Sequence, residues 1–186
     1  MKFRFPIVII DEDYRAENTS GFGIRALAAA IEEEGFEILG ATSYGDLSQF
    51  AQQQSRASAF ILSIDDEELG GDPEADTAVQ NLRNFIAEVR RKNEDVPIYL
   101  HGETKTSQHL PNDVLRELHG FIHMFEDTPE FVAKHIVREA KSYLEGIQPP
   151  FFKALLDYAE DGSYSWHCPG HSGGVAFLKS PIGQMY

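Results

Sequence analysis

The sequence has only one cysteine, Cys168, so a disulfide within the chain is excluded. It also lacks any run that approaches the roughly 20 apolar residues of a membrane span. Behind Met1 and Lys2, the apolar run Ile7–Ile10 is too short for the core of a signal peptide. These absences predict a cytoplasmic chain without a membrane partner.

Basic residues are scarce as well, because 30 acids stand against 16 bases and the formal net charge is -14 at pH 7. Nucleic acids and anionic membranes bind proteins that carry positive charge, so neither is an expected partner. An acidic surface of this kind faces water, cations or another protein. At 186 residues the chain is long enough for one packed domain and an appendage.

Short apolar runs alternate with helical patterns along the first part of the chain. The β-branched run Ile7–Ile10 has no polar alternation, which is typical of a strand buried on both faces of a parallel sheet. This alternation predicts an α/β fold: a flavodoxin-like, doubly wound, five-stranded parallel sheet of order 2-1-3-4-5. The other strands are predicted at 36–41, 57–64, 96–101 and 120–125, and the helices at 23–34, 46–51, 76–92, 111–118 and 128–143.

The last predicted helix ends near Gly146, because the prolines at 149 and 150 cannot continue it. A short amphipathic segment, 151–159, follows and leads to a glycine-rich loop. We therefore expect three parts in the chain. They are an α/β domain over 1–146, a linker with a short helix over 147–165, and a further part over 166–186.

Acids follow the first and third predicted strands, and this pattern resembles the phosphate-accepting site of bacterial response-regulator receivers. Asp11 and Asp13 come after the first strand, and Asp65 and Asp66 come after the third. Carboxylates that meet at one sheet edge suit a divalent cation such as magnesium. The resemblance is incomplete, because His101 stands where receivers have a hydroxyl residue and no lysine ends the fifth strand. The alternative, which we favour, is that these acids cap helices and turns.

The most distinctive stretch lies near the end of the sequence, where two histidines, a thiol, a proline and three glycines fall within 166–174. Proline and glycine exclude a regular helix there, so the stretch is predicted to be a shaped loop. His167, Cys168 and His171 carry atoms that zinc prefers, but a fourth protein ligand is not evident nearby, so no metal site is predicted. An aromatic ring beside imidazoles suits an organic ligand better.

The segment His167–Gly174, with Phe177–Gly183 after it, resembles the bacterial ornithine, lysine and arginine decarboxylases of the pyridoxal-phosphate fold type I group. The biodegradative arginine and lysine branch is the most similar. In that family a receiver-like wing domain and a linker precede the large cofactor-binding domain, which is entered through an H-x-P-G-H-x-G-G segment. The resemblance implies that 1–146 is the wing and that 166–186 is the truncated start of the pyridoxal-phosphate domain.

The resemblance also implies what this chain does and does not contain. Only Lys179 follows the motif, and it is not a credible Schiff-base lysine, so no catalytic residue and no bound cofactor are expected here. A full-length parent would use pyridoxal 5'-phosphate to decarboxylate a basic amino acid, releasing carbon dioxide and a polyamine or its precursor. The expected partners are then the large domain and further copies, in assemblies from homodimer to decamer.

Two roles stay open for the glycine-rich loop. The resemblance makes His167 and His171 candidates for contacts to substrate or cofactor, with Gly170, Gly173 and Gly174 shaping the backbone near the active-site entrance. The alternative is a structural loop that fixes the linker against the large domain, because a glycine-rich shape does not by itself identify a ligand.

Functions from different classes also remain for the chain. The resemblance implies that the wing supports oligomer assembly and its regulation, and an acidic surface lets association respond to pH through like-charge repulsion. The rival is a stand-alone receiver-like signalling domain phosphorylated at Asp65 or Asp66. A small intact enzyme built on His167, Cys168 and His171 is a weaker third reading, because no further group is evident to orient a base.

Overall fold

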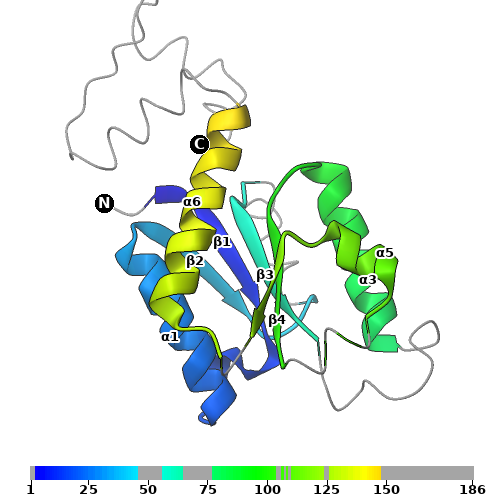
Figure 1. Cartoon of the computed structure of the whole chain (residues 1–186), viewed down its shortest axis with the longest axis horizontal. Coiled ribbons are helices and arrows are strands. Elements are labelled where there is room, and N and C mark those ends of the chain that lie inside the picture. The colour runs from blue at the N-terminus through cyan, green and yellow to red at the C-terminus, as the bar shows by residue number, and fades with distance from the viewer. Residues whose placement is uncertain are drawn as a thin grey trace, which may run out of the picture.

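The computed structural model describes residues 3–45, 56–64, 77–103, 106, 108, 110–123 and 126–147. Five parallel strands form one sheet, with helices on both of its faces (Figure 1). The strands are β1 Phe3–Ile10, β2 Phe36–Ala41, β3 Ala59–Ser63, β4 Ile98–Gly102 and β5 Gly120–His123. Their order is β2-β1-β3-β4-β5, so the predicted doubly wound α/β fold is confirmed.

Four α-helices and one 3-10 turn lie in the described ranges. They are η1 Glu12–Arg15, α1 Thr19–Glu33, α3 Thr77–Lys92, α5 Asn112–Glu117 and α6 Pro129–Ile147. The helix predicted at 46–51 lies outside the described residues. None of the described helices is long and apolar enough to cross a membrane.

Strand β1 is buried on both faces, as its apolar run predicts. Ile7 and Ile9 pack into a cluster with α1 and α6, while Val8 and Ile10 pack into a second cluster with α3. Figure 1 shows these two helical layers on opposite sides of the sheet. Burial of an aliphatic side chain contributes roughly 1.5–3 kcal/mol, so the alternation along this one strand holds both layers to the sheet.

Helix α1 begins earlier than the sequence predicts. The glycines at 21 and 23 favour a loop, but Asn18 is the N-cap and its side-chain oxygen accepts the Gly21 N–H at 2.7 Å. The cap satisfies one of the first free N–H groups, so α1 starts at Thr19. At the other end, Gly35 has a φ of 97°, the left-handed conformation that the predicted glycine cap requires.

Gly21 also lies where no larger side chain fits. A Cβ atom built on it would overlap the backbone carbonyl oxygens of Ala16 and Asp13. Gly23 belongs to the same helix, and nothing lies within 4 Å of a Cβ atom built there. The close approach of α1 to the end of η1 therefore depends on the glycine at 21 and not on the one at 23.

We predict opposite effects for alanine at these two positions. Gly21→Ala should lower the free energy of unfolding by about 2 kcal/mol or more, because the overlap with backbone atoms forces α1 to shift. Gly23→Ala should raise it by about 0.5–1 kcal/mol, because alanine has the higher helix propensity. Urea denaturation followed by circular dichroism measures both. Equal effects at the two positions would contradict the close approach of α1 to η1.

Candidate functional site

Polar residues meet at the carboxyl edge of the sheet. Asp11 follows β1 and is still extended (φ -151°, ψ 125°), Ser63 ends β3, and His101 lies in β4. Ser63 is aligned with His101, and β1 is aligned residue by residue with β3. Asp11 and His101 therefore lie at the same level on either side of β3. Because side chains alternate along a strand, both belong to the face that α1 and α6 cover.

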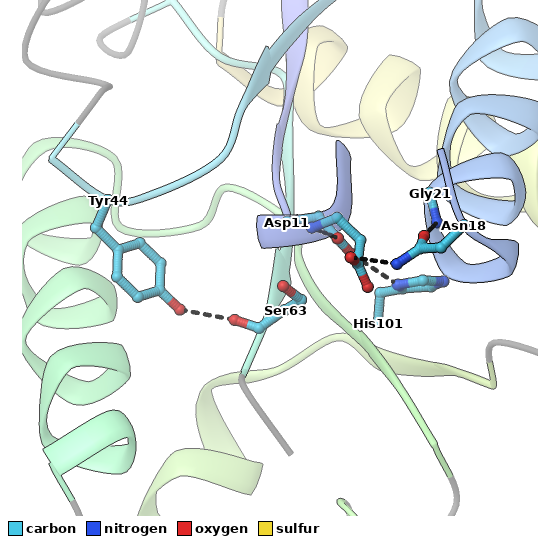
Figure 2. Close-up of polar contacts among 7 residues, drawn as sticks. Asp11, Asn18, Gly21, Tyr44, Ser63 and His101 are labelled. Carbon is cyan, nitrogen blue, oxygen red and sulfur yellow. Dashed lines mark hydrogen bonds and ion pairs between the residues drawn. The ribbon is translucent and has the colours of Figure 1, made fainter. Parts of the chain in front are cut away.

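The two side chains form a buried contact, with Asp11 Oδ2 and His101 Nδ1 3.1 Å apart (Figure 2). Asp11 is 4% exposed and His101 is 3% exposed. A carboxylate only accepts hydrogen bonds, so the contact is a hydrogen bond in the imidazole tautomer that has its hydrogen on Nδ1. A buried polar group without a partner costs about 1–3 kcal/mol, and this contact satisfies both groups.

Hydrogen bonds continue from this pair to the first helix. Asp11 Oδ1 accepts the N–H of Asp13 at 2.9 Å. Asp13 Oδ1 accepts from Asn18 Nδ2 at 2.8 Å. Asn18 in turn caps α1 by accepting the N–H of Gly21 (Figure 2). One connected chain of side-chain contacts therefore joins β4, the end of β1, η1 and the start of α1.

This geometry is structural and does not favour receiver chemistry. Both carboxylate oxygens of Asp11 already accept hydrogen bonds, and one oxygen of Asp13 does so too. Within the described ranges, no group of three or more His, Cys, Asp or Glu side chains is placed to hold a metal ion. Asp65 and Asp66 lie outside these ranges. The phosphate-accepting site at Asp65 or Asp66 therefore stays an untested alternative, and the described residues Asp11 and Asp13 are used for capping and packing.

A second polar contact lies on the other side of β3. The Tyr44 hydroxyl donates to the carbonyl oxygen of Ser63 at 3.0 Å, and its ring stacks on Phe85 with centroids 4.8 Å apart. Burial raises the pKa of Tyr44 above its ordinary value, so the hydroxyl keeps its proton and remains a donor. The carbonyl at the end of β3 is thereby satisfied within the fold (Figure 2).

Sequence reasoning missed the role of His101. From the sequence alone, His101 is only the residue that stands where receivers have a hydroxyl residue. The sequence did contain one indication of its role, which is the position of His101 in the fourth strand. An acid directly after the first strand and an imidazole in the fourth strand lie at the same edge of a sheet with this strand order. The contact with Asp11 joins residues 90 positions apart, so no local pattern indicates it.

The candidate residues of the glycine-rich loop, His167, Gly170, His171, Gly173 and Gly174, lie outside the described residues. Their contacts to cofactor or substrate stay a prediction. The same is true of the division of the chain into parts ending at 146 and 165.

Comparison with known families gives matches to both ends of the chain. Residues 19–143 match the family model described as Orn/Lys/Arg decarboxylase, N-terminal domain. Residues 149–186 match the model described as Orn/Lys/Arg decarboxylase, major domain. The family resemblance inferred from the glycine-rich loop is therefore confirmed by two matches, in the order expected.

Curated relatives agree with these matches. The chain is 33% identical to the lysine decarboxylase LdcA of Pseudomonas aeruginosa, over 98% of this chain and 24% of the relative. It is 28% identical to the biodegradative arginine decarboxylase of Escherichia coli, over 97% of this chain and 23% of the relative. The chain thus spans about a quarter of the length of the curated relatives it matches.

Solved structures support the fold. Lysine decarboxylase A from Pseudomonas aeruginosa aligns with a TM-score of 0.69 and 33% identity, over 98% of this chain and 24% of that one. A response-regulator receiver domain from Clostridium thermocellum aligns with a TM-score of 0.50 and 15% identity, over 74% of this chain and 94% of that one. The second likeness shows a shared topology alone.

The buried pair at the carboxyl edge generates a stability prediction. His101→Ala leaves Asp11 without its partner and opens a cavity, so the free energy of unfolding should fall by about 2–4 kcal/mol. Lys92→Ala is the control: it breaks an exposed pair with Glu88 and should cost less than about 0.5 kcal/mol. In the double variant Asp11→Asn/His101→Ala the losses should not add, because both changes act on one contact. Urea denaturation of these three variants and of Asp11→Asn alone measures the losses, and additive losses would contradict the pairing.

Proposed function

The chain belongs to the Orn/Lys/Arg decarboxylase family, and we propose that it is the non-catalytic N-terminal part of a pyridoxal-phosphate-dependent decarboxylase of a basic amino acid. The observation that carries the proposal is the order of the family matches, since the N-terminal domain at 19–143 precedes the major domain at 149–186. The parent reaction would remove the α-carboxylate of lysine, arginine or ornithine as carbon dioxide and leave the corresponding amine.

The described residues do not suit the cofactor itself. Pyridoxal phosphate needs a lysine for its Schiff base and an acid beside its ring nitrogen. The described lysines lie on α3 and α6 and keep solvent exposure, and Lys92 pairs with Glu88 at 2.7 Å. Asp11, the buried acid at the sheet edge, is bonded to His101. In this proposal the cofactor therefore belongs to the major domain of the parent, where His167 and His171 are candidates for contacts to it or to the substrate.

For the α/β domain we propose a role in assembly with further copies of the parent and in its regulation. Among the described residues, Asp11, Asp13 and His101 at its carboxyl edge are bonded within the fold, which leaves the surface of the domain for contacts with partners. The formal charge of -14 opposes association at neutral pH. Protonation of surface carboxylates as the pH falls reduces this repulsion, which makes association dependent on pH.

The test uses the parent protein in two forms, whole and without residues 1–146, beside the 186-residue chain. We expect carbon dioxide release from a basic amino acid by the whole parent and none by the 186-residue chain. Without the wing, the parent should keep its cofactor absorbance but sediment as smaller particles. The whole parent should sediment as larger particles at mildly acidic pH than at alkaline pH. Activity in the 186-residue chain, or sizes independent of wing and pH, would contradict the proposal.

The rival function, phosphorylation of a signalling domain, has its own discriminating measurement. The chain is incubated with magnesium and a small phosphodonor, and its intact mass is recorded. The rival needs Asp11 to help bind magnesium beside the phosphate-accepting acid. We expect no added phosphoryl group, because Asp11 is buried and both of its oxygens already accept hydrogen bonds. A mass gain that Asp65→Asn or Asp66→Asn abolishes would favour the rival instead.

A further inference from the structure

An open groove of about 370 Å³ lies at the amino edge of the sheet, opposite the edge that carries Asp11. One wall is the C-terminal half of α6, and the other is formed by the residues just before β4 and β5. No motif of the sequence points to it, and the proposed function does not use it. The residues that line it are Asp95, Pro97, His119, Glu139, Ser142, Tyr143 and Gly146.

The groove presents negative charge from both walls. Asp95 comes from the segment before β4, and Glu139 comes from α6. Arg138 donates to Glu139 and also contacts His135, but it is 70% exposed and both of its bonds to Glu139 go to Oε1. Arg90 also acts on the groove, yet its guanidinium is already bonded to the Glu117 carboxylate and to the backbone carbonyls of Val96 and Glu117. Asp95 and Glu139 are thus the acids that line the groove, and the Oε2 oxygen of Glu139 is not used by Arg138.

The other polar groups of the groove are neutral near pH 7. Burial, with Arg90 adding to it, holds the pKa of His119 below its usual value despite the nearby Asp95 and Glu139. Burial raises the pKa of Tyr143 to about 12, and Asp95 adds to the effect. The imidazole of His119 and the phenol of Tyr143 therefore add no positive charge and do not offset the carboxylates of Asp95 and Glu139.

A buried hydroxyl adjoins the same groove. Tyr99 is 2% exposed, and its hydroxyl has no hydrogen-bond partner within the part of the chain that the structure describes. Its ring lies 6.4 Å from that of His119, and Glu139 helps burial to raise its pKa to about 12. The Tyr99 ring therefore packs beside the groove residue His119, although Tyr99 is not itself among the residues that line the groove. Since buried polar groups are nearly always paired, an unpaired one at this wall indicates a missing partner.

From this arrangement we infer that the groove binds a small organic dication, an alkyl diamine. Two carboxylates from facing walls can each pair with an ammonium group, and the hydroxyls of Ser142 and Tyr143 can accept further ammonium hydrogens. The volume is within the range of small-molecule sites, and an apolar alkyl chain suits the proline and tyrosine surfaces. A hard metal ion fits less well, because no cluster of three ligating side chains occurs in the described ranges.

The identity of the ligand rests on the proposed function. Decarboxylation of lysine or ornithine leaves a diamine, so a groove on the N-terminal part that binds a diamine would sense the parent's product. Because the groove and the buried Asp11–His101 pair lie at opposite edges of the sheet, ligand binding needs no change in that pair. The inference concerns binding by this chain and not catalysis.

The binding test uses cadaverine, the diamine that lysine decarboxylation leaves, with the 186-residue chain and amide chemical shifts in NMR spectra. We expect saturable shifts, with a Kd in about the millimolar range or tighter, at the amides of Asp95, His119 and Gly146. The amide of Gly21 at the opposite edge should not move. Pentylamine, with one ammonium group, should bind at least about fivefold more weakly, and glutarate should not bind. Shifts spread over the surface, or equal binding of pentylamine, would overturn the inference.

Substitutions then locate the site. Asp95→Asn and Glu139→Gln should each weaken cadaverine binding by about fivefold or more, because each removes one charged acceptor. Glu94→Gln is the matched control: this exposed acid is next to Asp95 but does not line the groove, so affinity should stay the same. An equal loss in the control would show general attraction to an acidic chain and would overturn the site.

Tyr99→Phe is a further variant whose outcome does not depend on charge. It removes a hydroxyl that has no partner, so it should leave stability unchanged or slightly higher while cadaverine affinity falls. Unchanged affinity would count against the groove. These measurements use the isolated chain, and the parent's decarboxylase activity is measured separately. A chain that fails to bind cadaverine while its parent is active refutes this inference alone.

Discussion

Burial of the parallel sheet on both of its faces is the constraint on which the rest of this structure depends. A strand whose apolar side chains alternate between two helical layers needs a helix on each side, and crossover connections supply them. Each crossover returns the chain in the same direction, so the carboxyl ends of the strands gather at one edge and the amino ends at the other. The Asp11–His101 pair lies at the first edge, and the groove between Asp95 and Glu139 lies at the second.

Much of the fold could be predicted because its signals are local in the sequence. The β-branched run of β1, the glycine cap at Gly35 and the proline at the start of α6 each act within a few residues. The start of α1 could not be predicted in the same way. Two glycines lower the helix propensity around position 21, and a single Asn18 side chain outweighs them by bonding the helix N-terminus.

The site was less predictable than the fold because it depends on register. Acids at the ends of strands were visible in the sequence, but the partner of Asp11 became visible only once His101 was aligned across β3. This pairing gives Asp11 a structural role: at the edge where a receiver binds a cation, Asp11 takes part in contacts that join β4, η1 and the start of α1. The groove could not be predicted either, since its residues belong to no motif and meet only through packing of α6.

Helix α6 is the last described element, and it ends at Ile147, two residues before the match to the major domain begins at 149. Its buried face is anchored in the core, while one flank carries the groove residues Glu139, Ser142 and Tyr143. Because an α-helix is stiff along its axis, a tilt of α6 at the groove would also move its C-terminal end at Ile147. Helix α6 thus links the groove residues on its flank to the point in the sequence where the match to the major domain begins.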